Sequence, residues 1–149
     1  MLRSTAIATA VSGTLDIAFA MILTLLYGRE IGNMLRFVGS GPFPAAKDMG
    51  QSGAILGLLV HFTLMAVMAA AYVLAARRIP ALTERPMQWG ILYGLVTFVV
   101  MNWLVVPIRF DAPVPGKPLA IATQLFAHIA LVGIPIALVT AHFLRPRTA

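Results

Sequence analysis

The chain contains no cysteine among its 149 residues. Disulfides, catalytic thiolates and the zinc or iron–sulfur sites that need cysteine ligands are therefore excluded. Charge is also scarce, because Asp, Glu, Lys and Arg make up 11% of the residues, against about 25% in an average soluble domain. A water-soluble fold of this size is unable to bury the apolar remainder, since small domains keep much of their surface in water.

The short motifs on which common catalytic sites are built are missing as well. There is no glycine-flanked nucleophilic serine, no phosphate-binding glycine loop and no metalloprotease histidine pair. The 11 basic residues lie at the ends of apolar runs, where they meet lipid headgroups, and they form no patch interleaved with aromatic side chains. We therefore expect neither an enzyme nor a nucleic-acid partner.

What the sequence does contain is long apolar stretches. Apolar residues make up 60% of the chain, and the net charge is +6. Four runs cover residues 4–27, 51–76, 87–108 and 119–144. Each is long enough to cross a hydrocarbon core of about 30 Å as a helix. The sequence thus predicts an all-α, polytopic membrane protein: one membrane domain, folded as a four-transmembrane-helix bundle in contact with the lipid bilayer.

The connector between the first two runs, residues 28–50, is rich in Gly and Pro. Within it, Ile31, Met34, Leu35 and Val38 have the spacing of one apolar helix face. This stretch is too short to span a bilayer. We interpret it as a short interfacial helix between helices 1 and 2, with an ordered loop as the alternative.

The basic residues predict how the chain is oriented. An even number of spans places both termini on one side of the membrane. On that side Arg77, Arg78, Arg145 and Arg147 lie directly at span ends, in short segments where the positive-inside rule has most weight. We therefore predict both termini in the cytoplasm.

Small residues predict how the spans pack, because helices in lipid associate through close backbone approach. Pairs of small residues four apart occur in every span: Ala6 and Ala10, Gly53 and Gly57, Ala66 and Ala70, Gly90 and Gly94, and Gly133, Ala137 and Ala141. The proline at position 135 lies inside the fourth run and predicts a kink there, since it removes a backbone hydrogen bond. A tight bundle is expected; which faces serve oligomer contacts stays open.

Three spans each carry one titratable side chain at a similar depth. Asp16, His61 and His128 all lie about 15 Å from the same end of their runs, at a rise of 1.5 Å per residue. Asn102 and Gln124 form a second polar layer, about 9 Å from that end. A charged Asp at the bilayer centre costs about 3 kcal/mol or more, so this side chain must be protonated, paired or turned inward.

Four interpretations of this buried polar layer are open. The Asp and His side chains simply hold the bundle together by hydrogen bonds. Alternatively, they exchange protons in a proton- or ion-linked role. His61 and His128 would otherwise bind haem b as a bis-histidine electron carrier. Lastly, the two His and one Asp would ligate a divalent metal. An absorption spectrum distinguishes the haem interpretation from the others.

Several residues together resemble a known group of proteins. They are Gly13, Asp16, Phe19 and Ala20 in the first run, Tyr93–Val96, Met101–Trp103 and Pro107 in the third, and Ala127, His128, Gly133 and Pro135–Ala137 in the fourth. This pattern resembles a family of uncharacterised bacterial four-helix inner-membrane proteins and is more distantly similar to YagU-like membrane proteins. The resemblance implies bacterial origin, location in the inner (cytoplasmic) membrane and a four-span bundle. It implies no reaction; a homo-oligomer or an accessory subunit of a larger membrane complex is a further expectation.

Overall fold

A computed structural model describes residues 1–145, and that part of the chain is helical with no β-strand. The first two spans are α1 (Leu2–Leu26) and α3 (Gly50–Ala76). The third consists of α5 (Pro86–Val99), η2 (Val100–Val105) and α6 (Val106–Phe110). The fourth consists of α7 (Pro118–Phe126), η3 (Ala127–Gly133) and α8 (Ile134–Leu144). All four are long and apolar enough to cross a membrane, which confirms the predicted fold class.

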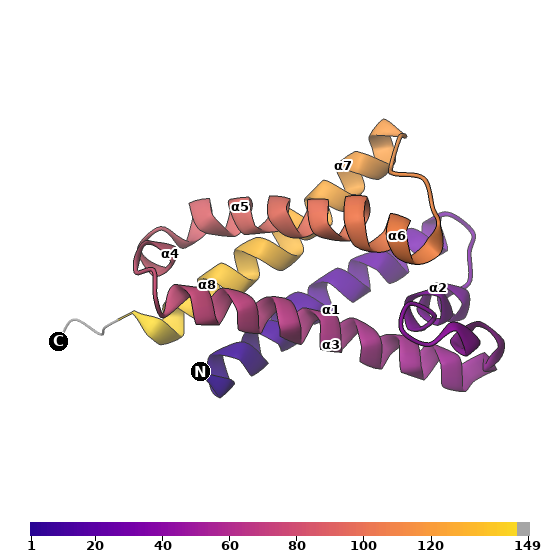
Figure 1. Cartoon of the computed structure of the whole chain (residues 1–149), viewed down its shortest axis with the longest axis horizontal. Coiled ribbons are helices and arrows are strands. Elements are labelled where there is room, and N and C mark those ends of the chain that lie inside the picture. Colours follow the sequence, from indigo (N-terminus) through magenta and orange to yellow (C-terminus); the bar gives the residue numbers. More distant parts are fainter. Residues whose placement is uncertain (146–149) are drawn as a thin grey trace.

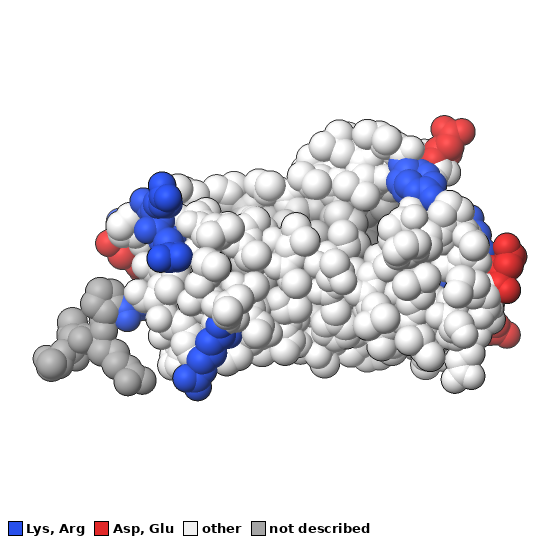
Figure 2. Space-filling view, turned by 60° about the horizontal axis from the view of Figure 1, so that its bottom comes forward, with Lys and Arg blue, Asp and Glu red and all other residues white. Residues whose placement is uncertain are grey.

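The four spans form an elongated bundle with its charged residues at the two ends (Figures 1 and 2). The N-terminus and the end of α8 lie at the same end, where the Arg3 guanidinium lies 5.5 Å from the centre of the Phe143 ring. The short α4 (Ala81–Glu84) also lies there, and Arg145 donates hydrogen bonds to the carbonyls of Thr83 and Glu84. Arg147, one of the cations used to predict orientation, lies outside the described residues.

The third and fourth spans pack through glycine, as their small residues predicted. A Cβ atom at Gly133 would collide with backbone atoms of Gly90 and Gly94. A Cβ atom at Gly94 would in turn collide with the backbone at His128 and Ile129. Such close approach gives membrane helices the contact area that a hydrophobic force supplies in water. The contact of Gly94 with the backbone at His128 also fixes the position of His128 along the axis of the bundle.

The packing predicted for the first span was wrong. Ala6 and Ala10 are exposed, and the buried small residues of α1 include Ser4, Ala8 and Ser12. The two sets alternate along the helix and therefore lie on different faces. Because this span is apolar nearly all round, its pattern gave no reason to prefer one face.

The connector between α1 and α3 folds onto α3. It contains α2 (Ile31–Gly39), which confirms the predicted short helix, and η1 (Pro44–Asp48). A Cβ atom at Gly57 would overlap the carbonyl oxygen of Leu35, and one at Gly53 would overlap that of Ala46. The glycine pair of the second span therefore receives the connector rather than another span.

The end of the third span is fixed to the same connector. Arg109 donates hydrogen bonds to the carbonyls of Ser40 and Gly41, the first of them at 3.0 Å. The Phe110 ring stacks on Phe37 with a centroid distance of 4.4 Å. Because α2 contacts both α3 and α6, it joins the ends of two spans that are separate in the sequence.

Two stretches of the bundle are π-helical. They are η2, which contains Asn102, and η3, which contains His128. Pro107 and Pro135 follow these stretches closely, and a proline cannot donate the hydrogen bond that would continue an α-helix. Wider turns of this kind are rare and occur often at functional sites. The predicted effect of Pro135 on the fourth span therefore takes the form of a π-helical segment around His128.

Candidate functional site

The pair formed by Asp16 and His61 is the centre of the candidate site. Asp16 Oδ2 lies 3.9 Å from His61 Nδ1, with the two side chains 19% and 8% exposed. This distance is within ion-pair range but longer than a direct hydrogen bond. Both groups lie near the middle of their spans, so the carboxylate has an imidazole partner where an unpaired charge would be costly.

The backbone of α1 determines which nitrogen of His61 is free. His61 Nε2 lies 3.0 Å from the carbonyl oxygen of Gly13, which can only accept a hydrogen bond. We therefore assign the proton of the neutral ring to Nε2, and Nδ1 is the bare nitrogen that faces Asp16. Gly13 makes this contact possible, because a side chain there would collide with Phe62 on α3.

His128 shows the same arrangement on the fourth span. Its Nδ1 lies 2.9 Å from the carbonyl oxygen of Gln124, one turn earlier in the helix. The neutral ring therefore donates from Nδ1 and leaves Nε2 free. α1, which carries Asp16, packs against both α3 and η3, the segments that carry His61 and His128.

The two amides of the second predicted layer are not drawn into this cluster. Asn102 donates a hydrogen bond of 3.2 Å to the carbonyl of Phe98 in its own helix. Gln124 is exposed, and it takes part through its backbone carbonyl, which His128 contacts. The structure thus brings Asp16 and His61 together, while Asn102 and His128 make their hydrogen bonds within their own spans.

An open pocket of about 610 Å³ leads toward the cluster from the end that carries α2 and α7. It lies between the end of α1, α2 and the start of α7, and Arg29 and Lys117 are among its lining residues. Its lining also includes Ala20 and Gln124, which are four residues from Asp16 and His128 respectively. One turn of helix, about 5.4 Å, therefore separates the pocket from the titratable groups.

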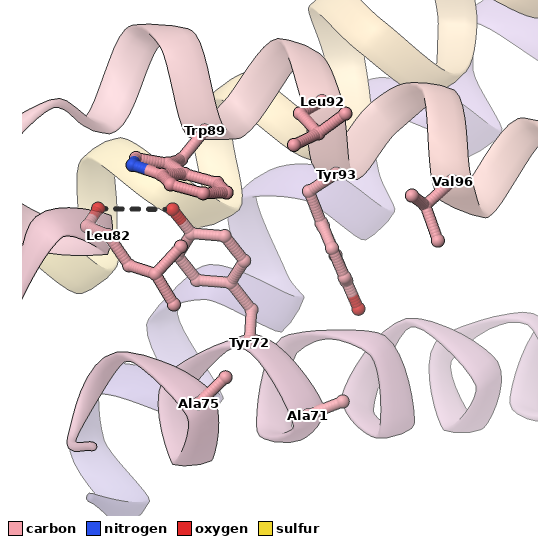
Figure 3. Close-up of a pocket in the computed structure, with 8 residues that line it drawn as sticks. All are labelled: Ala71, Tyr72, Ala75, Leu82, Trp89, Leu92, Tyr93 and Val96. Atoms are coloured by element: carbon pink, nitrogen blue, oxygen red, sulfur yellow. Dashed lines mark hydrogen bonds between the residues drawn. The ribbon is translucent and has the colours of Figure 1, made fainter. Parts of the chain in front are cut away.

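A second pocket, of about 240 Å³, lies between α3 and α5 and is lined by aromatic side chains (Figure 3). Tyr72 donates a hydrogen bond of 3.1 Å to the carbonyl of Leu82, and Tyr93 donates one of 2.8 Å to that of Met68. Tyr72 is 3% exposed, so its ring packs inside the bundle and does not face lipid. No Asp, Glu or His lines this pocket, so it is separate from the polar layer.

The residues do not fit a bis-histidine haem. Such a site needs two imidazoles that present a nitrogen to iron across an open gap. His61 instead directs Nε2 to Gly13, and its Nδ1 faces Asp16, which lies on the same helix, α1. Across residues 1–145, moreover, no group of three or more His, Asp or Glu side chains could hold a metal ion.

We expect detergent-purified protein from haem-supplied cells to show no Soret band, because Nε2 of His61 is bound to the Gly13 carbonyl and its bare Nδ1 faces Asp16 rather than an open gap. The measurement is an absorption spectrum of the oxidised and dithionite-reduced protein. A Soret band that disappears in His61→Ala and in His128→Ala would contradict this expectation.

The sequence did not reveal what holds the imidazoles in place. The acceptor for His61 is a backbone carbonyl 48 positions away in the chain, which no spacing rule identifies. The π-helical turn at His128 had a weak signal, namely the proline seven residues later. Searches with protein-family models, and comparisons with curated proteins and with solved structures, find no match to this chain.

Proposed function

We propose that this protein carries protons, or a solute that moves together with protons, across the membrane by way of Asp16, His61 and His128. One observation carries the proposal: His61 is fixed by the Gly13 carbonyl so that its bare nitrogen faces the carboxyl group of Asp16 near the middle of the bundle. Groups of this kind inside a membrane are typical of proton relays.

The geometry gives one proton two alternative positions. It sits on Asp16 while His61 is neutral, or it sits on His61 Nδ1 while Asp16 is ionised. The two states have the same net charge, but the second places an ion pair in the low-dielectric interior, where the short separation of the two groups stabilises it. His128, with its free Nε2, is a third acceptor on the side of the cluster toward the fourth span. The open pocket brings water to within about one helical turn of Asp16 and His128.

Proteoliposomes loaded with a pH-sensitive dye test the proposal. With an imposed membrane potential, wild-type protein should carry protons faster than empty liposomes do. Asp16→Asn should lower this flux by about 10²-fold, because positioned proton-transfer groups commonly contribute at least that much.

Asp48→Asn is the matched control, since it makes the same chemical change at an exposed carboxylate outside the layer. It should leave the flux unchanged. Equal flux in wild type and Asp16→Asn, in protein that is correctly folded, would reject the proposal. It would favour the interpretation in which the layer only holds the bundle together.

The proposal includes a location. We place the protein in the inner membrane of a bacterium with both termini in the cytoplasm. Support comes from Arg77 and Arg78, which directly follow α3 at the end that carries the N-terminus, and from the family that the sequence resembles. A reporter fused at each terminus would test the orientation.

The same layer could act in a homo-oligomer or in an accessory subunit of a larger membrane complex. Exposed Ala6 and Ala10 on α1 favour contact with a further helix, because small residues allow close approach. The mass of the particle extracted from native membranes distinguishes these forms from a single chain.

A further inference from the structure

The end of the bundle that carries α2 has five basic residues, and three of them are engaged within the protein. Arg36 donates a hydrogen bond of 3.3 Å to the carbonyl of Gly50, and Arg109 binds the carbonyls of Ser40 and Gly41. The ammonium group of Lys47 lies 6.0 Å from the centre of the Phe110 ring. All three cations thus have a partner within the protein.

The other two, Arg29 and Lys117, line the open pocket of about 610 Å³ that leads to the polar layer. Across residues 1–145, neither side chain forms a hydrogen bond or an ion pair with the protein. Glu30, the acid next to Arg29, accepts a hydrogen bond of 2.9 Å from Asn33 instead. Two cations from separate segments thus meet at one pocket without an anion from this chain.

The pocket is lined by both polar and apolar residues. Arg29 and Lys117 lie just beyond the ends of two spans, at the depth where lipid headgroups sit. Hydroxyl-bearing side chains, among them Thr24 and Thr123, lie on its wall. Apolar residues of α1 and α7, such as Leu23 and Leu119, complete the lining. The volume falls in the range of about 300–1,000 Å³ that is usual for ligand sites.

We propose that this pocket is a binding site for an anionic phospholipid. Its phosphate-bearing headgroup lies between Arg29 and Lys117, and an acyl chain follows the apolar strip of α1 and α7. A phospholipid matches both features of the pocket. Its phosphate is an anion at headgroup depth, where the two cations lie, and its acyl chain runs alongside the apolar residues of the spans. This site does not depend on the proposed proton transfer, although both use the same opening.

Native mass spectrometry of detergent-solubilised protein tests the site. The probes are dioleoyl phosphatidylglycerol, which is anionic, and dioleoyl phosphatidylcholine, which is zwitterionic, in equal amounts. We expect one phosphatidylglycerol molecule to be retained in preference to phosphatidylcholine. Lys117→Gln should lower its occupancy about fivefold, the effect of one basic residue near a charged headgroup.

Lys47→Gln is the matched control, because it removes the same charge at the same end of the bundle without touching the pocket. It should leave phosphatidylglycerol binding unchanged. An equal loss in both variants, or equal retention of the two lipids by wild type, would overturn the proposal. If millimolar inorganic phosphate displaces the lipid signal and binds alone, the occupant is a free anion and the lipid assignment is wrong.

A steric variant keeps the test valid if charge changes disturb the fold. Ala120→Trp fills the pocket from α7 and leaves both cations in place. It should abolish preferential phosphatidylglycerol binding. If Ala120→Trp loses lipid binding but keeps its proton flux, the lipid site is independent of the proposed function. Preserved lipid binding in Asp16→Asn would show the same independence.

Discussion

Gly133→Ala should lower the free energy of unfolding by about 3 kcal/mol, the upper part of the range for overpacked sites. The added methyl group would collide with backbone atoms of Gly90 and Gly94 on α5. Backbone atoms cannot rotate out of the way as a side chain can, so the third and fourth spans must separate. Separation would also remove contacts made by Val132 and Ile136, which are fully buried. Denaturation in mixed detergent micelles, followed by helical circular dichroism, measures the loss.

Gly116→Ala is the control for this experiment. Gly116 lies in the loop before α7, and a Cβ atom there has no atom within 4 Å. The same change of residue should therefore alter stability by no more than about 0.5 kcal/mol. If Gly133→Ala is as stable as this control, the close crossing of the third and fourth spans is absent from the folded protein.

His61→Leu should be the most destabilising change within the polar layer, at about 3 kcal/mol. It removes the imidazole that accompanies Asp16, and it leaves the Gly13 carbonyl without its partner. Replacing both members, as in Asp16→Leu with His61→Leu, should recover most of the loss, because no lone carboxylate then remains in the apolar interior. The same denaturation assay reports both values.

His142→Leu provides the matched comparison. His142 is exposed near the end of α8 and takes no part in an ion pair among the described residues. We expect it to leave stability nearly unchanged. A double variant that is no more stable than His61→Leu alone would mean that Asp16 and His61 are not energetically coupled.

The span boundaries could be predicted because lipid imposes a simple rule on them. A run of about 20 apolar residues suffices to define a spanning helix, and the charges at its ends limit it. The depth of Asp16, His61 and His128 followed from the same rule. Only the rise per residue was needed, and it is nearly constant along a helix.

The faces of the helices could not be predicted in this way. In a soluble protein, polar residues mark the outer side of a helix, but here both the lipid side and the protein side are apolar. Ala6 and Ala10 looked as suitable for packing as Ser4 and Ala8, and only the second pair is buried. The burial of Tyr72 could not be predicted either, since its acceptor, Leu82, comes from the turn after its own helix.

The docking of α2 has a consequence for the order in which the chain assembles. Its contacts are with Gly53 and Gly57, residues that are synthesised after it. While the ribosome is still producing α3, the connector has no surface to bind and must wait beside the translocation channel. The connector can therefore dock only after residue 57 has left the ribosome, so substitutions at those two glycines should delay this step of assembly as well as weaken the finished bundle.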